Sequence, residues 1–143
     1  MTLVVPFDGT ELAAAALDRA TEFAAVFDER IVVFSVVPTG NTEYTRERGW
    51  VERGESFDTE AVVERLREQV RTLAPDAEYR YETVGKFTSS GTISSRVREF
   101  AREVNASTVF IGSENAGHMV VGVSSVGGAI AAENAYDVVI VRD

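Results

Sequence analysis

A glycine- and serine-rich segment in the last third of the chain is the strongest candidate for chemistry. It begins at Gly112, directly after an apolar run at 109–111, and continues to Ser125, where small residues at 126–132 predict a helix. Glycine lets backbone N–H groups approach a ligand, and the N-terminus of a helix carries a partial positive charge. This order of strand, loop and helix predicts a site for an anion such as a phosphate, and the alternative is a loop that binds nothing.

A second candidate is the turn Asp8-Gly9-Thr10, which follows an apolar run at 2–6. Open α/β sheets bind ligands beyond the carboxyl ends of their strands, where Asp8 is expected to lie. Its carboxylate could contact a metal ion or a ribose. The alternative is a local role, in which Asp8 forms an Asx turn ahead of a helix capped by Thr10.

The residue types that most enzyme mechanisms need are absent or isolated. The chain has no cysteine, and its one histidine, His118, lies in the glycine-rich segment without an acidic partner placed beside it by the sequence. Disulfides, thiolate metal sites and cysteine catalysis are therefore excluded, and a zinc site is not expected. With no Ser-His-Asp set and no P-loop lysine, we expect a protein that is not an enzyme and has no catalytic residue. Slow ATP hydrolysis would need little beyond a metal ion and water.

The charge balance limits the partners, because the 143 residues carry a net charge of −9. Nucleic acids and anionic membranes repel such a chain, so neither is expected as a partner. Of 14 basic residues, 13 are arginine and only Lys86 is lysine. This composition is typical of a halophilic protein, with an ordinary acidic bacterial protein as the alternative. No apolar stretch could span a membrane and no basic leader precedes the first strand, so we expect a cytoplasmic protein.

The spacing of apolar residues predicts alternating strands and helices. Strands are expected at 2–6, 31–37, 78–84, 108–111 and 138–141, and helices at 13–27, 62–73, 93–104 and 126–132. Alternation of this kind predicts one α/β domain over 1–143, with a parallel sheet and helices on both of its faces. The run 78–84 alternates charged residues with tyrosine and threonine, which predicts an edge strand.

The last predicted strand is apolar on both faces, although a final strand often lies at the edge of its sheet. An exposed apolar edge pairs readily with another chain. We therefore expect a homodimer that forms through Val138, Val139, Ile140 and Val141.

Several segments resemble the universal stress protein family, and the resemblance covers nearly the whole chain. The segment 4–11, VVPFDGTE, resembles the family's opening strand and its Asp-Gly-Ser/Thr-Glu turn, and similar matches occur at 34–38, 106–113, 125–126 and 137–142. The resemblance implies an open parallel five-stranded sheet of order 3-2-1-4-5. This is the adenine nucleotide alpha hydrolase-like fold, commonly dimeric through the last strand.

Nucleotide-binding members of that family carry the motif G-x2-G-x9-G-[S/T], which this chain matches in part. Gly112 matches the first glycine and Ser125 matches the last position, but Asn115 and Ser124 stand where the family has glycine, and the loop is one residue short. The resemblance also implies an acidic contact at Asp8 and a backbone contact to adenine near Val36. The expected nucleotide site therefore comprises Asp8, Val36, Gly112, Asn115, Ser124, Ser125 and Val126.

This site lacks a cation, because no lysine or arginine lies between Arg102 and Arg142. A divalent ion, Lys86, or the pair Arg96 and Arg98 would have to balance the charge of a phosphate. We therefore expect a regulatory module that binds ATP or AMP weakly with Mg²⁺. The alternative is a ligand-free stress or adaptor protein that acts through protein contacts.

Two polar segments are expected to be loops. The stretch 39–57 includes Trp50, which could cover an adenine or simply anchor the loop. The stretch 85–95 is rich in serine and threonine, and it is expected to be a solvated insertion, with a second ligand-binding loop as the alternative.

Overall fold

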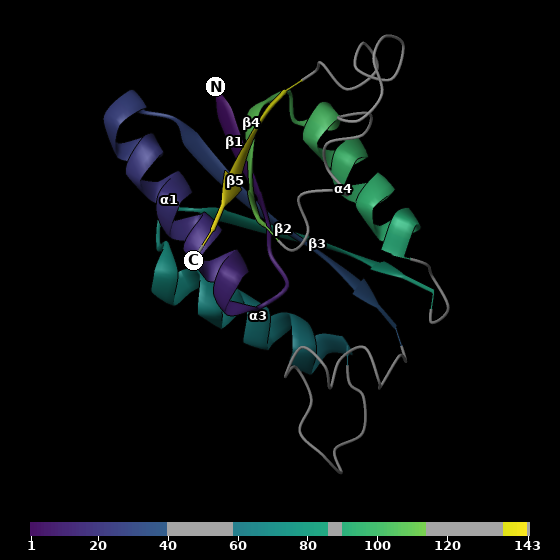
Figure 1. Cartoon of the computed structure of the whole chain (residues 1–143). Coiled ribbons are helices and arrows are strands. Elements are labelled where there is room, and N and C mark those ends of the chain that lie inside the picture. Colours follow the sequence, from purple (N-terminus) through teal and green to yellow (C-terminus); the bar gives the residue numbers. More distant parts are fainter. Residues whose placement is uncertain (40–58, 86–89, 114–135, 143) are drawn as a thin grey trace, which may run out of the picture.

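The computed structural model describes residues 1–39, 59–85, 90–113 and 136–142, and it contains a parallel sheet between helices (Figure 1). The strands pair in the order β3-β2-β1-β4-β5, which confirms the predicted fold class and strand order. The described strands are β1 (Thr2–Pro6), β2 (Arg30–Pro38), β3 (Glu78–Val84), β4 (Ala106–Gly112) and β5 (Asp137–Val141). The described helices are α1 (Glu11–Phe27), α3 (Thr59–Leu73) and α4 (Ser90–Glu103).

Two hydrophobic cores lie on opposite faces of the sheet, because neighbouring residues of a strand point to opposite sides. Leu3 and Val5 of β1 face α1 and α3, whereas Val4 between them faces α4. Figure 1 shows α1 and α3 on one side of the sheet and α4 on the other. The central strands are therefore apolar on both faces, as the sequence predicts.

The start of α1 is set by Thr10, whose Oγ1 accepts a hydrogen bond from the Ala13 N–H at 3.3 Å. Its buried face is made mostly of alanine, which lets the helix pack close to the sheet. The helix ends at Asp28, which adopts a left-handed conformation with φ 52° and donates its N–H to the Ala24 carbonyl.

The two edges of the sheet differ in chemistry. β3 is an edge strand, as predicted, and it carries exposed Arg80 and Tyr81, with Glu78 held between Arg30 and Arg80. β5 forms the other edge, and its Ile140 side chain is 46% exposed. Charged side chains discourage pairing of one edge with another chain, whereas the apolar edge lacks that protection.

One sequence expectation is wrong: the stretch 85–95 is not all loop, because α4 begins at Ser90. Apolar spacing predicts this helix only from Ile93, since its first residues are small and polar. Such residues fit the first turn of a helix, where backbone N–H groups have no partners within the helix. The predicted helix 126–132 and the loop that carries Trp50 lie outside the described residues.

Candidate functional site

The carboxyl ends of β1 and β4 lie side by side at the centre of the sheet. From this point the chain order runs outward in opposite directions, through β2 and β3 on one side and to β5 on the other. Open α/β sheets bind ligands beside such a reversal of strand order. The residues that follow β1 and end β4 therefore form the candidate site.

Asp8 lies in a tight turn directly beyond β1. Its Oδ1 accepts hydrogen bonds from the Thr10 backbone N–H at 3.1 Å and from the Thr10 hydroxyl at 2.6 Å. Gly9 between them has φ 82°, a conformation that favours glycine. The local role considered for Asp8 is therefore present, and it orients the carboxylate beyond the carboxyl end of β1. A ligand contact from Asp8 stays a prediction.

A buried serine ties this turn to the neighbouring strand. The Phe7 N–H donates to the Phe34 carbonyl at 2.9 Å, and the Ser35 hydroxyl donates to the Phe7 carbonyl at 2.6 Å. We did not single out Ser35 from the sequence as a site residue. The available signal was its polarity, since it is the one polar residue in the apolar run 31–37.

Val36 is placed on β2 where that strand continues past β1. Pairing between β1 and β2 ends at Pro6 and Phe34, whereas β2 stays paired with β3 as far as Pro38. The Val36 side chain is buried against α4. Because alternate residues of a strand direct their backbone groups to the same neighbour, the polar groups of Val36 face the turn that follows β1. This arrangement is compatible with the predicted backbone contact to adenine.

Gly112 ends β4 beside the first turn of α1. A Cβ atom added to it would lie 2.9 Å from Cγ and 3.1 Å from Cβ of Leu12. Real carbon contacts of this type are longer, so the absence of a side chain lets α1 begin close to β4. Gly112 therefore has a packing role that the sequence did not reveal, beside the predicted approach of a phosphate.

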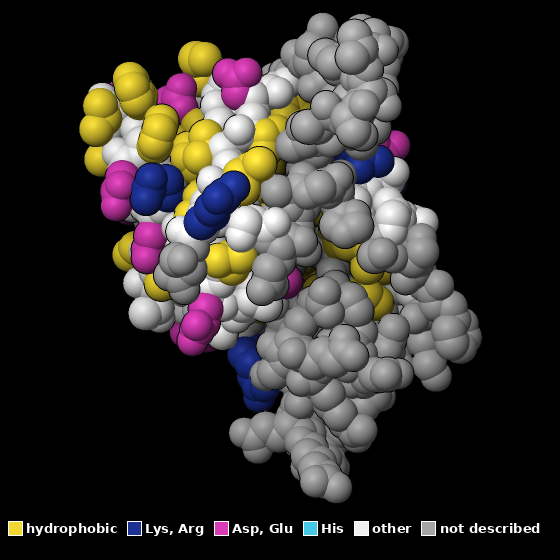
Figure 2. Space-filling model, in the orientation of Figure 1, with side chains coloured by type: hydrophobic (Ala, Val, Ile, Leu, Met, Phe, Trp, Pro, Cys, Tyr) yellow, Lys and Arg dark blue, Asp and Glu magenta, His cyan; other side chains and the backbone are white. Residues whose placement is uncertain are grey.

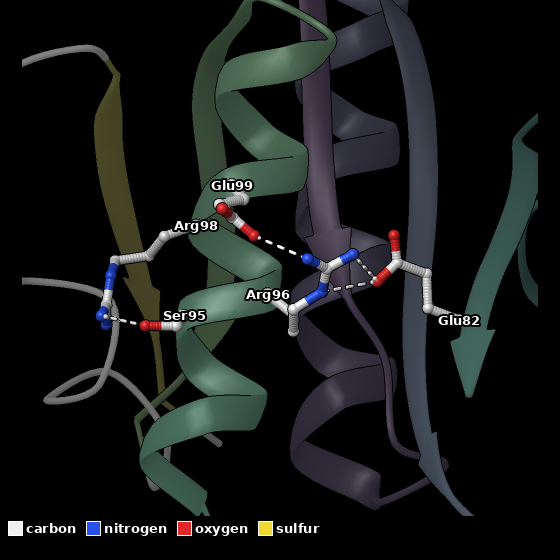
Figure 3. A network of polar contacts seen from close by, with 5 residues as sticks. All are labelled: Glu82, Ser95, Arg96, Arg98 and Glu99. Carbon is white, nitrogen blue, oxygen red and sulfur yellow. Dashed lines mark hydrogen bonds and ion pairs between the residues drawn. The ribbon is translucent and has the colours of Figure 1, made fainter. Parts of the chain in front are cut away.

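The two arginines considered as phosphate partners lie on α4 and already have contacts (Figure 3). The Arg96 guanidinium bonds to Glu82 through Nε at 2.9 Å and Nη2 at 2.7 Å, and to Glu99 through Nη1 at 2.8 Å. The hydrogen bond with Glu82 raises the pKa of Arg96, so its charge is held and balanced by carboxylates. Arg98 extends from the opposite side of the helix and bonds to Ser95 at 3.1 Å.

An open groove of about 720 Å³ runs between the start of α1 and α3, and Gly9 and Thr10 of the Asp8 turn line it. Phe7, Thr10 and Ala14 line one wall. Residues of α3 line the other wall. Three carboxylates line the groove, Glu11, Glu64 and Glu68, against one arginine, Arg65. A phosphate would be repelled there, so the groove does not serve as a second phosphate site.

The described part of the chain contains no cluster of three acidic or histidine side chains that could hold a metal ion. In the same residues, no helix combines the length and the apolar character that crossing a bilayer requires.

A model of the universal stress protein family matches residues 1–142, almost the full length of the chain. The chain belongs to the universal stress protein family. A search of curated protein sequences finds no match.

Solved structures of universal stress proteins share the fold of this chain. One, in complex with cAMP, is 21% identical, with a TM-score of 0.57 and coverage of 99% of this chain and 96% of that one. Universal stress protein UspA from Lactobacillus plantarum is 14% identical, with a TM-score of 0.56 and coverage of 99% and 97%. The Archaeoglobus fulgidus protein in complex with dAMP is 18% identical, with a TM-score of 0.52 and coverage of 98% and 96%.

In the structure of this universal stress protein, three of the seven predicted site residues lie at or near the carboxyl ends of neighbouring strands. Asp8 follows β1, Val36 lies two residues before the end of β2, and Gly112 ends β4. The other four, Asn115, Ser124, Ser125 and Val126, lie outside the described residues, as do His118 and Lys86.

Proposed function

We propose that this universal stress protein is a regulatory module that binds ATP or AMP weakly at the carboxyl edge of its sheet. The observation that carries the proposal is the convergence of three features at the switch in strand order: the Asp8 turn, the backbone of Val36 beyond β1, and the uncrowded Gly112. A carboxylate suits ribose hydroxyls, and backbone groups suit an adenine ring.

The relatives support an adenine nucleotide as the ligand class. One solved universal stress protein is in complex with cAMP, and the Archaeoglobus fulgidus protein is in complex with dAMP. Those ligands belong to those proteins. They come to this chain as a proposal because it shares the fold of those proteins and its described site residues lie at the switch in strand order.

We propose that Mg²⁺ accompanies the nucleotide and is not held by a resident metal site. The described residues contain no three-ligand acidic cluster, and Arg96 is already balanced by Glu82 and Glu99. With the charge of Arg96 already balanced, a bound divalent ion would reduce the repulsion between the phosphates and an acidic chain.

We further propose a homodimer through β5. This strand forms one edge of the sheet, so its outer backbone groups are unpaired within the sheet. Its Ile140 side chain is exposed, whereas Val141, which points to the opposite face of the sheet, is buried. Pairing of two β5 strands would satisfy their outer backbone groups and cover Ile140.

A ligand-free adaptor is the second candidate, and one surface favours it. Figure 2 shows hydrophobic side chains gathered at the upper left, where Figure 1 places the C-terminal part of α1. Val26 is 75% exposed and Phe27 is 62% exposed, and Phe23 beside them is partly exposed. Exposed aromatic clusters of this kind often contact other proteins.

Native mass spectrometry of freshly purified protein separates the two functions. The nucleotide proposal predicts an additional mass of an adenine nucleotide on the folded chain, and its loss in an Asp8→Ala variant. Asp18→Ala on the exposed side of α1 is the matched control, and it should retain the nucleotide. Binding of protein partners by a chain that carries no nucleotide would favour the adaptor.

A further inference from the structure

Ser35 is a polar residue in a place that otherwise selects for apolar side chains. Its side chain is 1% exposed in the middle of β2, and its neighbours along the strand, Phe34 and Val36, are also buried. A buried hydroxyl is tolerated only when it forms a hydrogen bond. The Ser35 hydroxyl forms a short one, 2.6 Å long, with the carbonyl of Phe7.

The bond from Ser35 affects the Asp8 turn because the Phe7 carbonyl directly precedes that turn. The Phe7 carbonyl and the Asp8 N–H belong to the same planar peptide unit, so fixing one fixes the direction in which the chain enters the Asp8 turn. Phe7 lies just past the last residue of β1, and its own N–H still donates to the Phe34 carbonyl of β2 at 2.9 Å. The Ser35 hydroxyl therefore continues the attachment of this segment to β2 by a side-chain bond.

We propose that Ser35 is a positioning residue of the nucleotide site, which acts through the Phe7–Asp8 peptide to hold the Asp8 carboxylate toward the ligand. The inference rests on the proposed nucleotide function. The chain of contacts runs from Ser35 to the Phe7 carbonyl, from that peptide to Asp8, and from Asp8 Oδ1 to Thr10, which caps α1. The first link is a hydrogen bond of 2.6 Å, the middle link is the covalent Phe7–Asp8 peptide, and the last consists of hydrogen bonds of 3.1 and 2.6 Å.

The chain offers a matched control at the opposite end of β1. The Ser107 hydroxyl on β4 donates to the Thr2 carbonyl at 3.2 Å, so it also joins a neighbouring strand to β1. Ser107→Ala removes the same group from the same kind of bond, but far along the strand from Asp8. Comparison of the two variants therefore distinguishes the general effect of losing a bond from serine to β1 from the specific effect of disturbing the Asp8 turn.

The test compares the full chain with Ser35→Ala, Ser107→Ala, Asp8→Ala and the double variant Ser35→Ala/Asp8→Ala. Calorimetry with ATP and Mg²⁺ should give about tenfold weaker binding for Ser35→Ala and less than about a twofold change for Ser107→Ala. The double variant should bind no more weakly than Asp8→Ala alone, because Ser35 acts through Asp8. Additive losses from the two substitutions would overturn the proposal.

Amide hydrogen exchange measures the same effect without a ligand. The Thr10 N–H, which donates to Asp8, should exchange at least about tenfold faster in Ser35→Ala and at the wild-type rate in Ser107→Ala. Unchanged exchange at Thr10 in Ser35→Ala would overturn the inference. If the wild type binds no ATP, the proposed function fails, and Thr10 exchange still decides whether Ser35 orders the turn.

A folding failure of Ser35→Ala does not end the test. Ser35→Cys keeps nearly the same volume and leaves a weaker donor at the same place. It should weaken ATP binding and speed Thr10 exchange in the same direction by a smaller factor. Wild-type values for both quantities in Ser35→Cys would contradict the proposal.

Discussion

Gly112 has two roles: it ends β4 beside the proposed phosphate loop, and its lack of a side chain leaves room for Leu12 of α1. Gly112→Ala should lower the free energy of unfolding by about 1–3 kcal/mol, because the new Cβ would lie 2.9 Å from Leu12 Cγ. Urea unfolding measures the loss. The reason is steric, so it applies whether or not a nucleotide binds.

A second substitution tests that reason. In the background of Leu12→Ala the space beside Gly112 is larger, so Gly112→Ala should cost much less there than in the wild-type chain. Equal costs in the two backgrounds would mean that contact with Leu12 is not why this position is glycine.

Tyr79 carries a buried hydroxyl that forms no hydrogen bond of good geometry among the described residues, although the Ser35 hydroxyl lies near it. Burial raises the pKa of Tyr79 above its ordinary value, and the nearby Ser35 hydroxyl and Arg67 oppose that rise only in part. A raised folded-state pKa means that folding favours the protonated phenol. Stability from this residue is therefore present below about pH 10, the usual pKa of tyrosine, and is lost as the pH rises through the folded-state value.

Tyr79→Phe should change the free energy of unfolding at neutral pH by less than about 1 kcal/mol, since it removes an unpaired buried hydroxyl. It should also reduce the loss of stability that occurs as the pH rises above about 10. Tyr81→Phe on the same strand, whose side chain is exposed, is the control. If the free energy of unfolding of Tyr79→Phe falls with rising pH as steeply as that of the wild type, the Tyr79 phenol does not control the loss of stability at alkaline pH.

The positions of Asp8, Val36 and Gly112 near the carboxyl ends of β1, β2 and β4 could be predicted from the sequence, because strand ends and turn residues leave local patterns. Their part in binding a nucleotide stays a prediction. The sequence did not predict the bond from Ser35 to Phe7, since those residues lie 28 positions apart and meet only when β1 pairs with β2. The bond from Arg96 to Glu82 was missed for the same reason, at a separation of 14. Both contacts change how the site is understood.

Among the elements, β5 has the clearest consequence for assembly. Ile140 is 46% exposed beside the free edge of that strand, and Val139 is packed partly against the core that includes α1. Ile140→Lys should therefore yield folded monomers, whereas Val139→Lys should destabilise the fold itself. Light scattering combined with circular dichroism distinguishes the two outcomes. A wild-type chain that is already monomeric at high salt would rule out the dimer.

Element positions were predictable where apolar spacing marks a buried face. The four helices and five strands were predicted from such spacing, and all the elements that fall within the described residues are present. Element ends were less predictable: β4 starts two residues before the predicted 108, and α4 starts three residues before the predicted 93. Those added residues are mostly polar or small, so they give no periodic signal.

At the scale of the whole molecule, the net charge of −9 sets the conditions under which the site can work. At low salt the field of the chain repels a triphosphate, because the Debye length reaches about 30 Å at 0.01 M. At molar salt that length falls to about 3 Å, and only groups near the phosphate matter. Screening and Mg²⁺ should therefore both strengthen binding, and neither should be needed by a loop that carries a lysine.

Calorimetric titration of the wild-type chain with ATP, at several molar salt and with and without Mg²⁺, is the decisive test of nucleotide binding. We expect a saturable heat with Mg²⁺ and a clearly weaker one after EDTA, both reduced by Asp8→Ala. Circular dichroism of the same samples verifies that the chain is folded. A folded chain that gives no heat under either condition would contradict nucleotide binding and favour the adaptor function.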